Sequence, residues 1–469
     1  MKHKKLSALV LFLAAVLLFM ILLTEGKELI LRKHQIMMAS AGAVVRFQDS
    51  PSCGSGAAEC GSLASHAADS CIMEPETPVR LQYDRYPLSL VYFVTGEDGT
   101  PIYAMPDTGA EQIRRSEARE KLGYAETVWA AEAQAENMQT EDGRTENIQT
   151  GSGENSAGQT VWYRVYWYET AEGYVTPDGS LEGAEKVFGF IPEGGAEKRR
   201  VRLDAMAEYI KKADSFVSAG AVTHVSNYKN GNGRPPAYHG QNADAAGTPR
   251  SQSAPAYPEL ENKEEFSYLE DGTLLLILDA AVDASGNSGE GAGAPAYRRV
   301  MDLRDGRPYF VPLKYVPSQE SLHALTKAVV VDRKNQNEAA FEKLDGVWTC
   351  VSYTMATTGA DNAYAAPTPL GYFLMIERRP QFYYYKDGTT EVQGYAPYVM
   401  RFCGGAYIHG VPVSYCDRNG KQIKPGIREY SSTMGTIPLS HKCVRNYTSH
   451  ARFLYDWYEA GQTAVIVIE

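Results

Sequence analysis

The sequence predicts a mainly β protein that carries one transmembrane helix at its N-terminus. Tyrosine is abundant, with 31 residues against 14 phenylalanines, and there are 42 glycines among the 469 residues. Tyrosine-rich and glycine-rich chains with few long amphipathic stretches favour strands over helices. Short apolar segments alternate with turn signals, whereas one long uncharged apolar run stands near the start. At about 100–200 residues per domain, this length allows about two to four domains.

The apolar run extends from Leu6 to Leu23 and follows the basic start MKHKK. Its 18 residues reach the lower limit for a helix that crosses the bilayer core. The lysines before it favour a cytoplasmic N-terminus, so residues 1–24 are expected to be a short tail and a single-pass membrane anchor. The rest of the chain would then lie outside the membrane. A cleaved signal peptide is the alternative, but its apolar region would be only about 7–15 residues long.

The charge balance argues against nucleic acid as a partner. Aspartate and glutamate outnumber lysine and arginine by 57 to 46, which gives a net charge of −11. The sequence contains no basic stripe that would suit a phosphate backbone. It does not indicate an oligomeric state.

Seven cysteines become candidates for disulfides if the chain lies outside the membrane. Their odd number leaves at least one thiol free or paired between chains. Cys53, Cys60 and Cys71 lie in a stretch rich in small residues, where a local disulfide would fit. His66 lies among them, but the spacing matches no common zinc pattern, so no metal site is predicted.

Residues 25–87 are expected to form a stalk, because much of this range is small and polar. From residue 88 the chain changes to short aromatic strands, and LSLVYFVT, PIYAMPD, WYRVYW and GFIPEG alternate with turns. This order predicts a small barrel over 88–195, and its pieces resemble a bacterial SH3-like domain. An unrelated five-stranded barrel fits the same pattern. Residues 131–160 are low in complexity and predict a disordered insertion between two strands.

A helix and a flexible linker are expected over 196–263, where LDAMAEYIKKADSFVSA precedes a polar, glycine-rich stretch. The pattern of small strands returns over 264–320. There, the pair Arg299-Val300 and the later Tyr309-Phe310-Val311-Pro312 echo two segments of the first predicted barrel. We therefore expect a second SH3-like module, followed by a C-terminal domain over 321–469.

The C-terminal domain places a histidine and a cysteine in a pattern that suits nucleophilic catalysis. His409-Gly410 ends an apolar strand, and Cys443 precedes a predicted helix. A nucleophilic thiol needs a base, a group that orients the base, and donors for an oxyanion. Free amides near a helix N-terminus would also stabilise a thiolate. Two structural alternatives stay open: a disulfide between Cys443 and Cys403 or Cys416, and His409 as a hydrogen-bonded residue at the end of a strand.

Four motifs follow one another in this domain. They are Pro367-Thr368-Pro369-Leu370-Gly371, Tyr407-Ile408-His409-Gly410, Ser440-His441-Lys442-Cys443-Val444-Arg445, and a helix ending Leu454-Tyr455-Asp456-Trp457 before a glycine and a final apolar strand. Together they resemble the catalytic domain of YkuD-type L,D-transpeptidases. The signature of that family pairs His-Gly or His-Ser with Ser-His-Gly-Cys-Val/Ile-Arg, and its Thr-Pro-x-Gly segment lies upstream.

The resemblance implies a β-sandwich with a short helix and a thiol mechanism that needs no metal or cofactor. Cys443 would attack the carbonyl of a peptidoglycan stem peptide to give a thioester. His409 would accept the thiol proton, and the backbone carbonyl of Gly410 would orient its ring. An amine from a neighbouring stem would resolve the thioester and form a 3→3 cross-link. The residues expected to shape or brace the loop, or to meet a substrate carboxylate, are Ser440, His441, Lys442 and Arg445.

Lys442 departs from the family pattern, which has glycine at this position. If the backbone takes a positive φ there, a lysine costs on the order of 1 kcal/mol or more. Its charge could instead lower the pKa of Cys443 or meet an anionic substrate. Asn446 replaces a usual apolar residue, and a long segment between His409 and Cys443 could act as a lid.

The predicted function is a membrane-anchored, extracytoplasmic L,D-transpeptidase that acts on peptidoglycan stem peptides. Two other types of cysteine enzyme fit less well. NlpC/P60 peptidases place the cysteine before the histidine, and sortases have a Thr-Leu-x-Thr-Cys strand that this sequence lacks. The alternative from another class is a non-catalytic cell-wall-binding protein, in which the SH3-like regions bind and the catalytic domain is degenerate.

Overall fold

The computed structural model describes residues 77–83, 89–131, 159–171, 173–174, 181–288, 294, 296–386, 389–416, 421–428 and 433–469. These ranges are mainly strands with two α-helices, α2 (Leu203–Ala219) and α3 (Thr448–Trp457), which confirms the predicted mainly β class. No helix in them is long and apolar enough to cross a membrane. The expected anchor over 1–24, the stalk as far as residue 76, and residues 132–158 of the predicted insertion lie outside the described residues.

The first described sheet has eight strands in the order β3-β2-β7-β5-β4-β1-β8, with β6 beside β5. The strands are β1 (Val91–Thr95), β2 (Pro101–Tyr103), β3 (Gln112–Arg115), β4 (Lys121–Ala131), β5 (Gln159–Thr170), β6 (Gly173–Tyr174), β7 (Glu185–Pro192) and β8 (Ala196–Arg200). Their buried side chains form one apolar cluster that includes Phe93, Leu122 and Trp167. The assignment of this region as SH3-like stays a prediction.

We call residues 222–316 the middle module. Its strands are β9 (Val222–His224), β10 (Ser253–Ala256), β11 (Ser267–Glu270), β12 (Leu274–Ile277), β13 (Tyr297–Asp302) and β14 (Pro308–Pro312). They form a four-stranded sheet in the order β14-β13-β12-β9 and a separate β10-β11 pair. Both contribute to one core cluster that includes Val225, Leu275 and Val311. The predicted second SH3-like module stays a prediction.

Part of the predicted flexible linker is an ordered section of the middle module. Asp244 is buried, and its carboxylate accepts hydrogen bonds from the backbone amides of Ala246, Thr248 and Tyr268 at 3.0, 2.8 and 2.7 Å. The following strand β10 is buried along its whole length. Hydrogen bonds to an ionised carboxylate are strong, so they order a polar segment that looks flexible from its composition alone.

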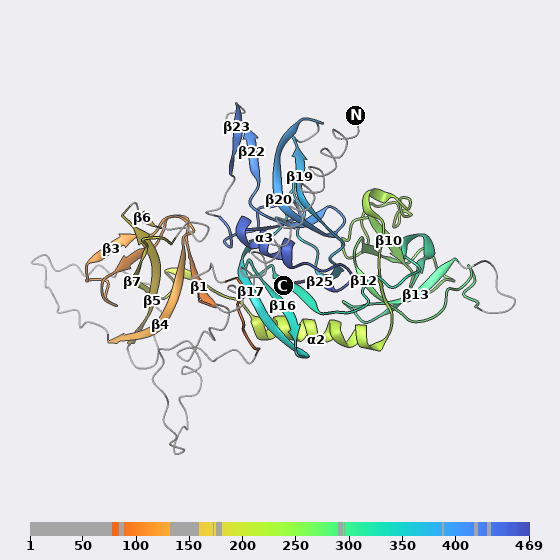
Figure 1. The fold of residues 1–469 in the computed structure, drawn as a ribbon, viewed down its shortest axis with the longest axis horizontal. Coiled ribbons are helices and arrows are strands. Elements are labelled where there is room, and N and C mark those ends of the chain that lie inside the picture. Colours follow the sequence, from red (N-terminus) through yellow and green to blue (C-terminus); the bar gives the residue numbers. More distant parts are fainter. Residues whose placement is uncertain are drawn as a thin grey trace, which may run out of the picture. The chain divides into compact units, whose positions relative to one another are not determined.

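The C-terminal domain contains an eleven-stranded sheet within its described residues. Its order is β18-β25-β15-β16-β17-β24-β21-β20-β22-β23, with β19 beside β20. The strands are β15 (Lys327–Asp332), β16 (Asn337–Leu344), β17 (Val347–Thr357), β18 (Gly371–Leu374), β19 (Glu377–Tyr385), β20 (Val392–Cys403), β21 (Ala406–His409), β22 (Val413–Cys416), β23 (Gln422–Arg428), β24 (Val444–Asn446) and β25 (Thr463–Ile468). Figure 1 shows the β19–β20 and β22–β23 hairpins as two long ribbons.

The last strand of the chain, β25, lies inside this sheet, next to the edge strand β18. Strand β25 pairs in parallel with β15 and antiparallel with β18, and all of its residues are buried. Continuous apolar runs such as AVIVI are typical of strands that are covered on both faces. One core cluster packs side chains of β15, β18, β20, β21, β24 and β25 against helix α3, and it includes Val329, Phe373, Phe402, Ile408, Val444, Leu454 and Val465.

Helix α2 packs beside β16 and β17, as Figure 1 shows. Its buried residues recur every three to four positions, at Leu203, Met206 and Ile210, which gives the helix one apolar face. Near its C-terminal end, Asp214 accepts a hydrogen bond from Lys343 Nζ of β16 at 2.7 Å. The helix therefore contacts the C-terminal domain through an ion pair near its C-terminal end.

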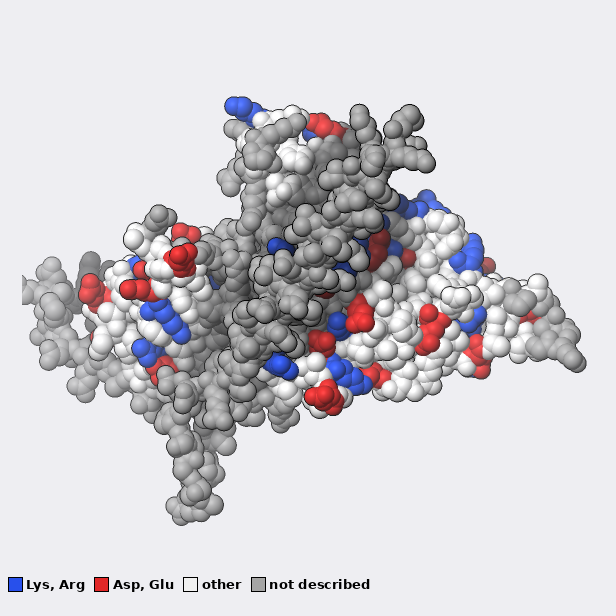
Figure 2. Space-filling view, viewed as in Figure 1, with Lys and Arg blue, Asp and Glu red and all other residues white. Residues whose placement is uncertain are grey.

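Charged side chains of both signs are interspersed on the face shown in Figure 2. No patch of blue residues dominates the described surface in that view. A binding site for a nucleic-acid backbone needs clustered lysine and arginine, so this face gives no support for such a site.

We expect Phe402→Ala to lower the free energy of unfolding of the C-terminal domain by about 3–5 kcal/mol, because it removes apolar contacts and leaves a cavity. Phe402 is fully buried, and its ring centroid lies 5.5 Å from that of Phe373. Urea unfolding followed by tryptophan fluorescence measures the change. Val347→Ala, at an exposed position of β17, is the control and should change the free energy by no more than about 0.5 kcal/mol. Equal effects of the two substitutions would contradict the core assignment.

Candidate active site

The parallel pairing of β21 with β24 brings together the two motifs of the predicted site. Ile408 aligns with Val444, and His409 aligns with Arg445. Cys443 directly precedes β24 and therefore lies beside the backbone of Tyr407, one step before the aligned pairs. Two motifs that are separated by the whole β22–β23 hairpin thus become neighbours in one sheet.

The Cys443 thiol is partly covered and lies between backbone groups. Its Sγ donates to the carbonyl oxygen of Gly405 at 3.8 Å, and the backbone of Tyr407 acts to lower the pKa of the thiol. Burial raises the pKa of the thiol, because desolvation penalises the thiolate. The Tyr407 backbone and the charges of Arg445 and Lys442 act in the opposite direction without offsetting the burial. The resting side chain is therefore a neutral thiol.

His409 is held as a neutral base. Its side chain is buried, and its Nδ1 lies 2.7 Å from the Gly410 carbonyl oxygen. A carbonyl only accepts hydrogen bonds, so Nδ1 carries the proton and Nε2 keeps a lone pair. Burial lowers the pKa of His409 to about 4, although the hydrogen bond to Gly410 acts to raise it. The Phe382 ring meets the imidazole at 85°, with centroids 5.5 Å apart. An uncharged imidazole with a free Nε2 can accept a proton at neutral pH.

Gly410 sits where the backbone has no room for a side chain. A Cβ at this position would lie 2.9 Å from Pro397 Cγ and 3.2 Å from Thr448 Cα. Its amide donates to the Pro397 carbonyl at 2.8 Å. The close packing fixes the peptide whose carbonyl holds the His409 ring, so the glycine acts through its backbone, as the resemblance implies.

Two hydroxyl groups fix the loop that carries Cys443. The Ser440 hydroxyl donates to the Cys443 carbonyl, and the Thr368 hydroxyl donates to the Lys442 carbonyl at 3.0 Å. Thr368 also accepts from the Gly359 amide at 2.8 Å. Both hydroxyl residues are buried. The Pro-Thr-Pro-Leu-Gly segment therefore contacts the loop through Thr368.

Lys442 has the backbone conformation that a glycine would adopt most easily. Its φ is +88°, in a region that other residues enter at a cost of roughly 1–2 kcal/mol. Its ammonium nitrogen lies 2.5 Å from Glu270 Oε1 in the middle module. Burial acts to lower the pKa of Lys442, but the neighbouring Cys403 and Glu270 raise it overall. Lys442 is therefore charged and paired within the protein.

The other two predicted loop residues differ in their surroundings. His441 is exposed, whereas Arg445 lies opposite His409 in the β21–β24 ladder. The charge of Arg445 acts to lower the pKa of both Cys443 and His409. Strand β24 lies between Cys443 and helix α3 in the sequence, and α3 begins at Thr448, where the sequence predicts the helix.

The described cysteines are free thiols. Cys350 and Cys403 are buried, and Cys416 and Cys443 are partly exposed, so the alternative disulfide of Cys443 is not formed in this structure. Cys53, Cys60 and Cys71 lie outside the described residues. The residues with described positions contain no group of three or more histidine, cysteine, aspartate or glutamate side chains that could hold a metal ion.

A buried polar network explains the unusual Asn446. Its amide donates to Glu338 Oε1 at 2.7 Å, and the same oxygen lies 3.4 Å from His450 Nδ1. His450 Nε2 in turn lies 2.8 Å from the Ser352 hydroxyl. These residues are fully buried, and a buried carboxylate needs such partners. The asparagine at the end of β24 thus gives one oxygen of the buried Glu338 carboxyl group a hydrogen-bond donor.

Nothing in the sequence indicates that three further residues lie beside the site. The Phe382 ring stacks on the Tyr407 ring, with the ring centroids 5.0 Å apart, and meets the His409 imidazole edge to face. Glu270 and Asp271 reach the site from the middle module. In the sequence, these two acidic residues form only the start of a turn before a glycine.

Residues 326–467 match the family model of YkuD, the L,D-transpeptidase catalytic domain. This segment is therefore an L,D-transpeptidase catalytic domain, and its limits lie within the predicted C-terminal domain. No curated protein matches the chain.

Several solved structures are similar to parts of the chain at low identity. An L,D-transpeptidase from Mycobacterium smegmatis is 15% identical with a TM-score of 0.24, and the match covers 42% of this chain and 90% of that one. L,D-transpeptidase 3 from Mycobacterium tuberculosis, with a faropenem-derived adduct, is 15% identical with a TM-score of 0.25, over 43% of this chain and 92% of that one. A fused zinc-dependent amidase, peptidase and peptidoglycan-binding protein from Clostridium acetobutylicum is 16% identical with a TM-score of 0.21. That match covers 30% of this chain and 52% of the other, so the chain spans about half the length of this relative.

We expect the stability of the C-terminal domain to fall between pH 7 and pH 5, in part because of His409. Its folded pKa of about 4 lies below the ordinary value of 6.5. Between these values the unfolded chain binds a proton that the native state excludes, so unfolding becomes more favourable as pH falls. The contribution of His409 to this loss is about 2 kcal/mol at pH 5. Urea unfolding at the two pH values measures it.

His409→Asn should reduce this pH dependence by about the same amount, whatever it does to the stability at pH 7. Part of the dependence should remain in the variant, because burial also lowers the pKa of His224 in the middle module to about 4. A pH dependence identical to that of wild type would contradict a buried, neutral His409.

Proposed function

We propose that the catalytic domain at residues 326–467 is an active L,D-transpeptidase on peptidoglycan stem peptides, with Cys443 as its nucleophile. One observation carries the proposal: His409 is neutral, its Nδ1 is held by the Gly410 carbonyl, and its strand pairs with the strand that follows Cys443. A thiol whose pKa is raised contains little thiolate at neutral pH, so it needs such a base in order to react.

In the acylation step, the Cys443 sulfur attacks the carbonyl carbon of a stem-peptide bond. The thiol proton passes to Nε2 of His409, and backbone amides of the Cys443 loop stabilise the oxyanion. When the tetrahedral intermediate collapses, the C–N bond breaks and the imidazolium gives its proton to the leaving amine. The products are a thioester on Cys443 and a neutral His409.

In the transfer step, the amine of a neighbouring stem peptide attacks the thioester. His409 accepts a proton from this amine and returns it to the sulfur as the C–S bond breaks. The products are a new amide, which is a 3→3 cross-link, and the free thiol. His409 thus serves both steps from one position, and no metal or cofactor takes part.

The neutral resting state of the thiol and the imidazole determines when the proton is transferred. Because the thiol and the imidazole are both uncharged before reaction, the proton moves as the sulfur attacks. The backbone of Tyr407 already acts to lower the pKa of the thiol, so it would stabilise the negative charge that develops on the sulfur. Preorganised groups of this kind lower a barrier because they need no rearrangement. In the resting structure the thiol donates to Gly405, and catalytic hydrogen bonds often form only with substrate bound.

Membrane anchoring is part of the same proposal. The apolar run from Leu6 to Leu23 would hold the chain in the cell membrane, with its C-terminal bulk on the cell-wall side. The SH3-like regions would contribute binding to the wall. An anchored enzyme with this orientation would meet its polymeric substrate directly.

Covalent labelling by a carbapenem or penem tests the nucleophile. Imipenem and a faropenem-derived adduct occur in solved structures of L,D-transpeptidases, so both compounds are suitable probes. We expect the full-length protein in detergent to gain an adduct mass that maps to Cys443, and we expect Cys443→Ala to gain none. Cys416→Ala removes another partly exposed thiol of the same sheet and should be labelled as wild type is.

An adduct on Cys443→Ala would show that the nucleophile is assigned wrongly. Absence of an adduct on wild type would favour the alternative, a non-catalytic cell-wall-binding protein with a degenerate catalytic domain. With muropeptide tetrapeptides as substrate, a thioester mass on Cys443 and a dimer linked 3→3 are expected. A dimer with another linkage would contradict the predicted specificity and leave the acylation mechanism intact.

We expect His409→Gln to slow the acylation of Cys443 by about 10²–10⁴-fold, because a glutamine cannot accept the thiol proton. Intact-mass measurement of the adduct over time gives the rate. The adduct that does form should still map to Cys443. Phe382→Leu, which changes a ring beside His409 and leaves the base in place, should lose far less rate. An equal loss in both variants would contradict proton transfer by His409.

A further inference from the structure

The end of β11 and the turn that leads to β12 contact the C-terminal domain through four consecutive residues, Glu270, Asp271, Gly272 and Thr273. Glu270 brings this segment of the middle module to the Cys443 loop. In the sequence these residues give only a turn signal, which accounts for none of the contacts described below.

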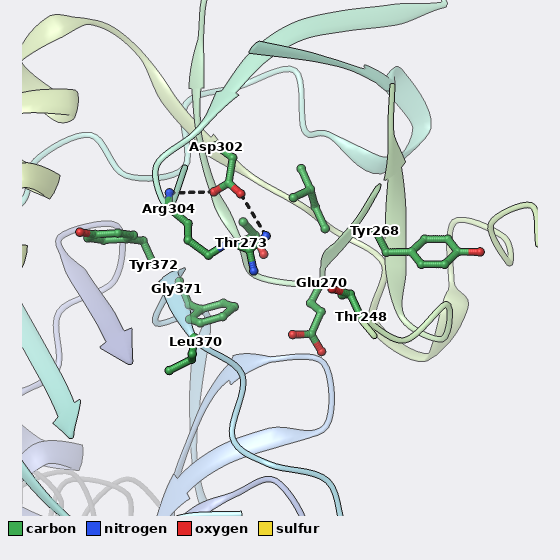
Figure 3. A pocket seen from close by; sticks show the side chains of 11 residues that line it. Thr248, Tyr268, Glu270, Thr273, Asp302, Arg304, Leu370, Gly371 and Tyr372 are labelled. Carbon is green, nitrogen blue, oxygen red and sulfur yellow. Dashed lines mark hydrogen bonds and ion pairs between the residues drawn. The ribbon is translucent and has the colours of Figure 1, made fainter. Parts of the chain in front are cut away.

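Glu270 pairs with the residue next to the nucleophile. Its Oε1 lies 2.5 Å from Lys442 Nζ, and the two side chains are only 11% and 20% exposed. Glu270 also lines a pocket whose other walls include Leu370 and Gly371 of the C-terminal domain. Figure 3 shows the Glu270 carboxylate directed away from its own strand, toward the side on which Leu370 lies. The ion pair therefore forms where the middle module meets the C-terminal domain.

Asp271 holds the other side of the thiol. Its carboxylate pairs with Arg401 at 2.6 Å and accepts from the Gly404 amide at 3.1 Å. Asp271 and Arg401 are both buried. Gly404 precedes Gly405, whose carbonyl accepts from the Cys443 thiol. The two acidic residues thus reach both segments that border Cys443.

The remaining two residues fix the turn on the sheet. Gly272 has φ +89°, and a Cβ there would lie 1.9 Å from the Phe402 carbonyl oxygen. Its own carbonyl accepts from the Leu374 amide at 2.9 Å, and Thr273 bridges to Phe373. Only glycine allows an approach this close. The turn is therefore docked by its backbone, and the two carboxylates are held in place rather than free to rotate.

We propose that Glu270 is a positioning residue for the reaction at Cys443: it neutralises Lys442 and ties the middle module to the nucleophile's loop. The inference rests on the proposed function only in taking Cys443 as the reactive thiol. Without Glu270, an ammonium group would stand unbalanced beside the sulfur. Without Lys442, a carboxylate would stand there instead. Because the two charges of the pair offset each other, neither charge acts alone on the pKa of the thiol. His409 remains the group that removes the thiol proton.

Several charged or titratable groups face the thiol or its lysine neighbour, and the pair acts among them. They are Lys442 and Arg445 on the segment of Cys443, His409 and Tyr407 on β21, Cys403 and Arg401 on β20, Glu377 on β19, and Tyr228, Glu270 and Asp271 from the middle module. Asp271 already balances Arg401. Substituting one member of the Glu270–Lys442 pair therefore changes the net charge beside the thiol.

The test is the pH dependence of Cys443 alkylation by iodoacetamide, resolved by peptide mass spectrometry on the full-length protein in detergent. Glu270→Gln leaves the lysine charge unbalanced and should move the titration midpoint of Cys443 down by roughly half a pH unit or more. Lys442→Met leaves the carboxylate unbalanced and should move the midpoint up by a similar amount. The double variant should titrate within about 0.2 pH unit of wild type, because both charges are gone.

A merely structural clamp predicts a different result. If the ion pair only holds the loop, both single variants should change the reactivity in the same direction and the double variant should not recover; either of these outcomes, or no shift at all, overturns the proposal. Cys416 in the same sample is the internal reference and should titrate alike in all variants. Glu265→Gln removes an exposed carboxylate of the same module and should leave Cys443 unchanged.

A second substitution keeps the test valid if Lys442→Met folds poorly. Lys442→Gly removes the same charge and is compatible with φ +88°, so it should fold and should shift the midpoint upward as well. A downward shift in this variant would contradict the proposal. Alkylation reports the thiol whether or not the protein acylates, so failure of this proposal is distinguishable from failure to form a carbapenem adduct.

Discussion

The parallel pairing of β21 with β24 is the constraint on which the rest of the site depends. It aligns His409 with Arg445 and sets Cys443 beside Tyr407. Strand β24 also pairs with β17, where Ala356 aligns with Asn446, so the base and the thiol are both built on the main sheet. A site built on strands fixes the positions of its reacting groups more precisely than a site built on loops. The short strand β24 thus links the reacting groups to the core of the domain.

Burial decides the protonation of the two reacting groups. It raises the pKa of the Cys443 thiol and lowers that of the His409 imidazole, so both are neutral at rest. Neutral groups can be buried without the desolvation cost of an ion pair. Two charged residues nearby are paired with carboxylates of the middle module, Lys442 with Glu270 and Arg401 with Asp271. Charges close to the thiol are thus partly balanced from outside the catalytic domain.

Local sequence patterns were sufficient for much of the fold. The alternation of short aromatic strands and turns predicted a mainly β protein, and the apolar AVIVI predicted the strand that became β25. Within the predicted linker over 196–263, composition does not show that Asp244 accepts hydrogen bonds from three backbone amides. Nor does composition show that a three-residue strand separates Cys443 from α3. The SH3-like modules and the membrane anchor stay predictions.

The sequence alone identified the candidate nucleophile and base, because the order of the motifs around His409 and Cys443 is a property of the chain. It also marked Lys442 as the residue that the family pattern does not explain. Only the tertiary structure supplied the explanation, since Glu270 lies 172 residues away along the chain. A contact over such a distance leaves no periodicity or spacing in the sequence. The same holds for the protonation of His409 and Cys443, because burial is a property of the packed domain and not of any segment.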